Sequence, residues 1–85
     1  MTHRVLLASS ARKDLDGLPG DVRDIILHEI SLLENVPRPP GSKKLKGQAH
    51  NWRIRVRDWR VLYAIETRQA VIKIYRIRHR KEVYR

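Results

Sequence analysis

A short stretch, residues 52–57, alternates without interruption between apolar and basic side chains. The apolar set is Trp52, Ile54 and Val56, and the basic set is Arg53, Arg55 and Arg57. Successive side chains of a β-strand point to opposite faces of a sheet, so the two sets separate onto two faces. A shift of one residue in the strand pairing would bury the guanidinium groups, which fixes the register strongly. We therefore expect a strand whose apolar face meets a core and whose arginine face stays uncovered.

Turn signals divide the rest of the chain into helical and extended segments. After residue 21, apolar residues recur at spacings of four, four and three, which predicts an amphipathic helix. These residues are Val22, Ile26, Ile30 and Leu33. The segment 17–20 separates this helix from a shorter one, and the proline-rich residues 37–41 follow it. The expected elements are a strand at 4–8, helices at about 9–15 and 19–35, and strands at 52–57, 59–65 and 70–77.

This order, β-α-α-β-β-β, predicts an α+β fold with two layers. The two helices would form a hairpin packed on one face of a largely antiparallel four-stranded sheet, and the other face would stay open. A chain of 85 residues is too short for two hydrophobic cores, so we expect a single domain over residues 1–85.

The positive charge of the chain is concentrated in its second half. Residues 1–40 hold five Lys or Arg and six Asp or Glu, whereas residues 41–85 hold fourteen and three. The whole net charge of +10 therefore belongs to the second half. Clustered positive charge attracts polyanions and is the electrostatic signature of nucleic-acid binding.

Other function classes are disfavoured by what the sequence lacks. There is no cysteine, which excludes a disulfide framework and a thiolate ligand or nucleophile. No signal segment and no run of about 20 apolar residues is present. His3, His28 and His50 lack the spacing of metal ligands, and there is no phosphate-loop motif. We expect a soluble cytoplasmic protein without metal, cofactor or membrane association.

Several motifs along nearly the whole chain resemble those of the RelE/ParE superfamily, the small toxins of bacterial type II toxin–antitoxin systems. The matching segments are Leu18-Pro19, Leu45-Lys46-Gly47, Trp52–Arg57, Trp59–Tyr63 and His79–Arg85. RelE-type members cut messenger RNA in the ribosomal A site, and ParE-type members poison DNA gyrase. The resemblance implies a toxin that is neutralised by a cognate antitoxin in a hetero-oligomer, with messenger RNA and ribosomal RNA as its other partners.

The resemblance to RelE-type members also implies a set of catalytic residues. By motif position these are Arg53, Arg55, Arg60, Arg80 and Tyr84. Arginine stays protonated far above neutral pH, so it is a poor general base. Histidine is the side chain whose ordinary pKa lies near neutral pH, so His79 joins the set as a candidate acid or base. Glu66 and Glu82 are further candidate bases, less well placed by the motif.

Further basic residues are candidates for RNA contact. They are Lys43, Lys44, Lys46, Arg57, Arg78 and Lys81. Two alternatives to an endoribonuclease stay open at this point: a ParE-like gyrase poison that does not cut RNA, and a nucleic-acid-binding module that has no catalytic activity.

Overall fold

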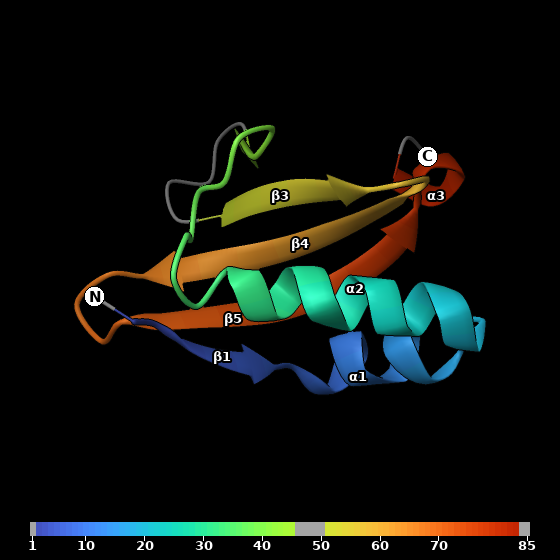
Figure 1. Ribbon diagram of the computed structural model, residues 1–85, viewed down its shortest axis with the longest axis horizontal. Helices are drawn as coiled ribbons and strands as arrows, with labels where there is room; N and C mark the ends of the chain where they lie inside the picture. The colour runs from blue at the N-terminus through green and yellow to red at the C-terminus, as the bar shows by residue number, and fades with distance from the viewer. Residues whose placement is uncertain (1, 46–50, 84–85) are drawn as a thin grey trace.

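The computed structural model describes residues 2–45 and 51–83 (Figure 1). Its elements, in chain order, are β1 (Arg4–Leu7), α1 (Ser9–Asp16), α2 (Gly20–Leu32), β2 (Lys43–Lys44), β3 (Asn51–Val56), β4 (Trp59–Glu66), β5 (Val71–His79) and α3 (Arg80–Val83). The strands form one sheet in the order β1-β5-β4-β3-β2. β1 runs parallel to β5, and the other neighbouring strands are antiparallel.

The predicted fold class is confirmed, with one addition. The sheet has five strands where the sequence predicts four, because β2 pairs with the outer edge of β3. β2 is two lysines long and lies in a segment for which the sequence predicts neither a helix nor a strand. The sequence of β2 shows no alternation of apolar and polar residues, so no sequence pattern predicts a strand there. The strand forms because its backbone pairs with the hydrogen-bonding edge of β3. The helix α2 also ends at Leu32, three residues before the expected end.

The core lies between the two long helices and one face of the sheet. On the helices the buried residues are four positions apart, and on the strands they are two apart except between Ile74 and Ile77 of β5. Its helical members are Ala11, Leu15, Ile26 and Ile30, and its strand members are Ile54, Val56, Val61, Tyr63, Ile65, Ile72, Ile74 and Ile77. Trp52 is partly buried against the same cluster. The expected separation of the 52–57 strand into an apolar face and a basic face is therefore correct for β3.

The alternation of β5 is interrupted by a bulge at Tyr75. Ile74 is opposite Tyr63, but Arg76 is opposite Leu62, so one residue of β5 has no counterpart on β4. A bulge of this kind reverses which face the following side chains occupy. Ile72, Ile74 and Ile77 consequently share the core face. Without the bulge, the side chains beyond residue 75 would change places between the core and the open face.

The end of β5 is held by α1 rather than by a strand. β1 pairs with β5 only as far as Ile74. Beyond that point Asp14 of α1 accepts a hydrogen bond from the backbone N–H of Ile77 at 2.9 Å through its Oδ2 atom. The same oxygen lies 3.2 Å from Nε of Arg76. The Asp14 carboxylate thus supplies a hydrogen-bond acceptor for the backbone N–H of Ile77 at the edge of β5. It also draws the Arg76 side chain toward α1.

The connection between β3 and β4 changes the interpretation of Arg57. β3 ends at Val56, and Arg57 has a φ of 56°, in the left-handed region. Arg57 is therefore a turn residue and not the third member of the arginine row on the strand. The alternation of apolar and basic residues continues past the end of the strand. The end of the strand is set by the place where the chain turns back toward β4, and the alternation does not show that place.

Within the described residues, no helix is both long enough and apolar enough to cross a membrane.

Candidate nucleic-acid interface

Basic side chains gather on the sheet face opposite the helices, in two rows that run across the strands. In the first row, Arg60 of β4 is directly opposite Arg55 of β3 on one side and Arg78 of β5 on the other. In the second row, Lys43 of β2 is directly opposite Arg53 of β3. Directly opposite residues share a sheet face, and their Cα atoms are about 4.5–5.5 Å apart. The strand register therefore assembles five basic residues from four strands.

Four of these residues enclose a cavity of about 310 Å³, which we call the basic pocket. The basic pocket is lined by Gly41, Lys43, Arg53, Arg55 and Arg60. Arg60 is only 6% exposed, whereas Arg55 is exposed. Gly41 has a φ of +90°, a conformation that glycine adopts without strain, and it turns the chain into β2.

Like charges placed directly opposite each other on a sheet destabilise it. The Arg55–Arg60–Arg78 row sets three such charges side by side, with Arg60 largely removed from solvent. Electrostatic interactions strengthen where water is excluded, so an anion bound here would be held more tightly than on an exposed surface. Guanidinium groups bind phosphate with two parallel hydrogen bonds. The arrangement suits a phosphate group of a polyanion.

His79 does not belong to this pocket. It is directly opposite Trp59, on the side of the sheet that faces the core rather than the arginines. The two rings meet edge to face, with 5.1 Å between their centroids. The Nδ1 atom of His79 accepts a hydrogen bond from the backbone N–H of Lys81 at 3.3 Å. The structure therefore separates His79 from the arginines that the sequence groups with it, because consecutive strand residues face opposite ways.

Arg80 is placed at the start of α3, near the turn between β3 and β4. Its backbone N–H donates to the carbonyl of Asp58 at 2.7 Å, and its Nε atom is 3.8 Å from Oδ1 of Asp58. Neither Arg80 nor Lys81 lines the basic pocket. Tyr84, the last residue of the predicted catalytic set, lies outside the described residues.

The predicted RNA-contact residues fall into different places. Lys43 lines the basic pocket, but its neighbour Lys44 is opposite Trp52 and so belongs to the other face of the sheet. Arg78 lies in the first basic row, whereas Arg57 occupies the exposed turn. Lys46 is among the residues that the structure does not describe. Basic residues that are close in the sequence are thus placed on different faces of the sheet, or in a turn, once the strands pair.

Tyr63 contributes to the interface in a way that the sequence does not indicate. The side chain is fully buried. Its hydroxyl donates a hydrogen bond to the carbonyl of Pro37 at 2.8 Å. Burial raises the pKa of Tyr63 to about 12, and a hydrogen bond with Ser42 opposes that rise. Tyr63 therefore ties both ends of the 37–42 segment to the sheet, and this segment leads into Lys43.

Among the described residues, no three His, Asp or Glu side chains come together in a way that could hold a metal ion. The donors of the basic pocket are guanidinium and ammonium groups, which repel metal cations.

Comparison with known proteins identifies a family whose sequence model matches this chain. Residues 5–84 match the family described as ParE toxin of the type II toxin-antitoxin system, parDE. A comparison with curated protein sequences gives no match.

Solved structures of similar fold come from archaea and bacteria. The archaeal RelE–RelB complex from Pyrococcus horikoshii OT3 contains a chain 32% identical to this one, with a TM-score of 0.83 over 94% of this chain and 97% of that chain. The RelB–RelE antitoxin–toxin complex from Methanococcus jannaschii gives 30% identity and a TM-score of 0.77, over 93% and 94%. The isolated E. coli RelE toxin, at 22% identity and a TM-score of 0.81 over 96% and 90%, shares the fold.

The fold and these matches define the class of protein as a small toxin of a type II toxin–antitoxin system. Within that class, the chain belongs to the RelE/ParE superfamily. This confirms the resemblance seen in the sequence. The matched family is described as ParE, while the similar structures are RelE proteins, so membership in the superfamily does not by itself select the target.

Proposed function

We propose that this toxin is a ribosome-dependent endoribonuclease that cleaves messenger RNA in the ribosomal A site and thereby inhibits translation. The observation that carries the proposal is the basic pocket, in which Arg53, Arg55 and Arg60 converge with Lys43 on an open sheet face. Its chemistry fits a phosphodiester group. The open face would accept a single strand of RNA without any rearrangement of the helices.

The proposed reaction is an attack of a ribose 2′-oxygen on the adjacent phosphorus. A new P–O2′ bond forms, the P–O5′ bond breaks, and the products are a 2′,3′-cyclic phosphate and a free 5′-hydroxyl. Negative charge builds on the phosphate oxygens in the transition state, and fixed cations lower its energy. The guanidinium groups of Arg53, Arg55 and Arg60 would supply this stabilisation.

One proton must leave the 2′-hydroxyl and one must reach the 5′-oxygen. The described lining of the basic pocket offers only guanidinium and ammonium groups for this task. Arginine does not release a proton at neutral pH, so a group from outside this lining is required. Tyr84, with Arg80 close to it in the sequence, is our candidate for orienting or exchanging these protons. His79 is disfavoured because its ring lies on the opposite face of the sheet.

An antitoxin and ribosomal RNA complete the proposed set of partners. The similar complexes from Pyrococcus horikoshii and Methanococcus jannaschii each pair a RelE chain with a RelB chain. By analogy, we propose a cognate antitoxin that covers the basic face of this toxin in a hetero-oligomer. Outside the basic pocket, Lys44, Arg57, Arg78 and Lys81 remain candidates for contact with the ribosome, and the proposed site of action is the cytoplasm.

A second function, poisoning of DNA gyrase, is supported by two observations. The matched family is the ParE toxin, and the described part of the basic pocket contains no general base. In that case the same arginines would bind without cleaving.

The experiment that tests the proposal is a translation reaction containing purified toxin and a defined message, read by primer extension. We expect breaks at codon positions of the translated message only, and none when ribosomes are omitted. The variants Arg53→Ala and Arg60→Ala should lose cleavage, and Arg23→Ala, at an exposed basic residue of α2, should retain it. An intact message together with gyrase-dependent cleavage of plasmid DNA would reject the proposal in favour of gyrase poisoning.

A further inference from the structure

Part of the wall of the basic pocket comes from a segment with little support of its own. Gly41 and Lys43 belong to the chain between α2 and β3, and the strand β2 within it is only two residues long. Both lysines of β2 are exposed, so burial does not hold them in place. The position of Lys43 opposite Arg53 therefore depends on what fixes the residues before β2.

The hydroxyl group of Tyr63 holds both ends of the segment 37–42. It donates a hydrogen bond to the carbonyl of Pro37 at 2.8 Å. It also makes a hydrogen bond with Ser42, which lowers the pKa of Tyr63 against the effect of burial. A hydrogen bond that favours the ionised phenol is one that the phenol oxygen accepts, so the Ser42 hydroxyl is the donor. One oxygen atom thus joins residues 37 and 42.

The aromatic residue beside Tyr63 provides a second attachment for the same segment. Trp52 of β3 is directly opposite Tyr63 of β4, on the same face of the sheet. The guanidinium carbon of Arg38 lies 5.2 Å from the centroid of the Trp52 ring, within the range of a cation–π interaction. Two facing aromatic side chains therefore hold two consecutive residues of the segment, Pro37 and Arg38.

The segment between these attachments has few conformations available. Pro37, Pro39 and Pro40 each fix their own φ angle. The backbone N–H of Ser42 donates to the carbonyl of Pro39 at 2.9 Å and closes a turn. Pro40 and Gly41 are the central residues of this turn, and the φ of +90° at Gly41 is typical of a type II turn. A stiff segment of this kind carries the position of its attachment points on to the residues that follow it.

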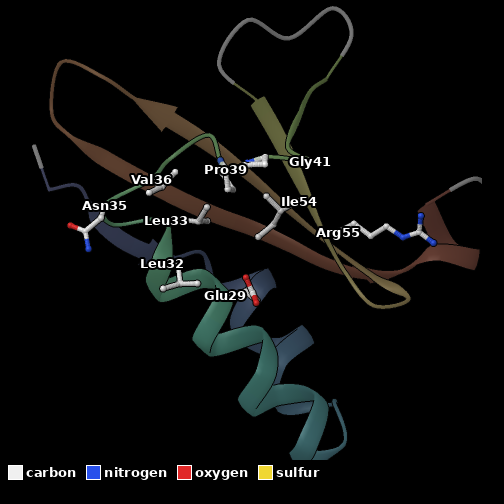
Figure 2. Close-up of a pocket in the computed structure, with 10 residues that line it drawn as sticks. Glu29, Leu32, Leu33, Asn35, Val36, Pro39, Gly41, Ile54 and Arg55 are labelled. Carbon is white, nitrogen blue, oxygen red and sulfur yellow. The ribbon is translucent and has the colours of Figure 1, made fainter.

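Tyr63 is linked to the basic pocket without lining it. Its ring belongs to the core cluster on the helical face of the sheet, and the pocket is lined by other residues. Figure 2 shows the connecting segment, which passes from Val36 through Pro39 to Gly41 beside the strand β3. At Gly41 the segment reaches the wall of the pocket. The segment is therefore the structural connection between the buried hydroxyl and the cations of the open face.

We propose that Tyr63 is a positioning residue for the basic pocket: by fixing the segment 37–42, it places the ammonium group of Lys43 against a phosphate of bound RNA. Tyr63 itself touches no RNA. The contact between Lys43 and RNA rests on the function proposed above, whereas the fixing of the segment by Tyr63 does not.

The test is a double-mutant cycle between Tyr63→Phe and Lys43→Ala, read as affinity for a short fluorescent RNA by anisotropy. Each single replacement should weaken binding by about twofold or more. Each should also reduce the slope of log K against log salt concentration by up to about 0.7. In the Lys43→Ala background, Tyr63→Phe should cause no further loss. A residue that only supported the fold would lower the affinity equally in both backgrounds.

Ser42→Ala is a second variant, which breaks the same attachment without changing a core residue. It should weaken RNA binding, and it should have no further effect in the Lys43→Ala background. Ser31→Ala is the matched control, because Ser31 donates a hydrogen bond to the carbonyl of His28 on the exposed surface of α2 and does not line the pocket. This control should leave the RNA affinity unchanged. Circular dichroism and thermal unfolding verify that each variant is folded.

A second arm needs no RNA and measures amide hydrogen exchange in wild type and Tyr63→Phe. The amides of Ser42 and Leu45, which donate to Pro39 and Asn51, should exchange about fivefold faster in the variant. Both lie at the edge of the sheet and exchange through local opening, so a uniform loss of global stability would not change them.

The inference is overturned if the exchange of these two amides is unchanged, or if the effects of Tyr63→Phe and Lys43→Ala on RNA affinity simply add. It is also overturned if Ser42→Ala and Ser31→Ala behave alike. A wild-type toxin that binds no RNA would instead reject the proposed function, and the exchange measurement would still decide whether Tyr63 fixes the segment.

Discussion

Arg60 on β4 and Arg78 on β5 lie directly opposite each other on the open face of the sheet. They do so because the bulge at Tyr75 shifts the pairing between Leu62 and Tyr63 by one residue. Arg60 is at the same time opposite Arg55 on β3, so three guanidinium groups stand in one row. Like charges directly opposite each other tend to destabilise a sheet, and a bound phosphate would offset that repulsion.

The replacement Arg55→Thr should change stability and RNA binding in opposite directions. It removes a like charge opposite Arg60 and supplies a β-branched residue, so the free energy of unfolding should rise by about 0.2–1 kcal/mol. Affinity for a short RNA should fall, since the basic pocket loses one of its cations. Urea denaturation and anisotropy measure the two quantities. A variant that is both less stable and undiminished in RNA affinity would contradict the role given to this row.

Lys43 and Lys44 form a matched pair for testing the face of the sheet that RNA contacts. Both are exposed and both belong to β2, but they point to opposite faces. For single-stranded nucleic acid, each phosphate contact contributes about −0.7 to the slope of log K against log salt concentration. Lys43→Ala should reduce the slope by about that amount, and Lys44→Ala should leave it nearly unchanged. Equal effects of the two replacements would indicate binding that does not distinguish the faces.

The buried hydroxyl of Tyr63 predicts a loss of stability at high pH. An unfolded tyrosine ionises near pH 10, whereas the folded protein keeps Tyr63 protonated until a pKa of about 12. Its contribution is therefore fully present below pH 10 and declines as the pH rises toward 12, by roughly 2–3 kcal/mol. Tyr63→Phe should be less stable by about 1 kcal/mol at pH 7 because the hydrogen bond to Pro37 is lost.

The measurement is the difference in unfolding free energy between wild type and Tyr63→Phe, followed from pH 8 to pH 11.5. Tyr75, whose pKa is also raised by burial, is present in both proteins and cancels in the difference. The wild type should lose its advantage above pH 10. A difference that stays constant over this range would show that Tyr63 ionises normally.

Asp14 should matter to stability more than its salt bridge with Arg76 suggests. Asp14→Ala leaves the backbone N–H of the buried Ile77 without its 2.9 Å acceptor, which costs about 1–3 kcal/mol. Arg76→Ala removes only a partly exposed ion pair, worth about 0–1 kcal/mol. Asp16→Ala, an exposed change on the same helix, should stay within about 0.5 kcal/mol. Chemical denaturation ranks the three, and a reversed order would refute this account of the β5 edge.

His79→Gln should leave RNA cleavage largely intact. Its ring packs on Trp59 and faces away from the basic pocket, so a neutral replacement removes no group near the phosphate. The pH profile of cleavage between pH 5.5 and 8 should match that of the wild type. If cleavage falls by about two orders of magnitude, or the acidic limb of the profile disappears, His79 acts in proton transfer after all.

The β3 strand shows how far the sequence alone could go. Alternation of apolar and basic residues is sufficient to place Ile54 in the core and Arg53 and Arg55 on the open face, because the period of a strand is set by backbone geometry. The amphipathic helix and the α+β class follow from the same kind of periodicity. The concentration of positive charge after residue 40 is likewise a property of the sequence, and it is enough to indicate a polyanion as partner.

Tertiary structure decided which of the basic residues meet. Arg78 and His79 are neighbours in the sequence, but the bulge at Tyr75 sets Arg78 beside Arg60 and turns His79 toward Trp59. Lys43 enters the site only because β2 adds to the edge of β3, and that pairing depends on hydrogen bonds between two separate segments of the chain. A local pattern determines the face a side chain occupies on its own strand, whereas register, bulges and edge pairing determine its neighbours.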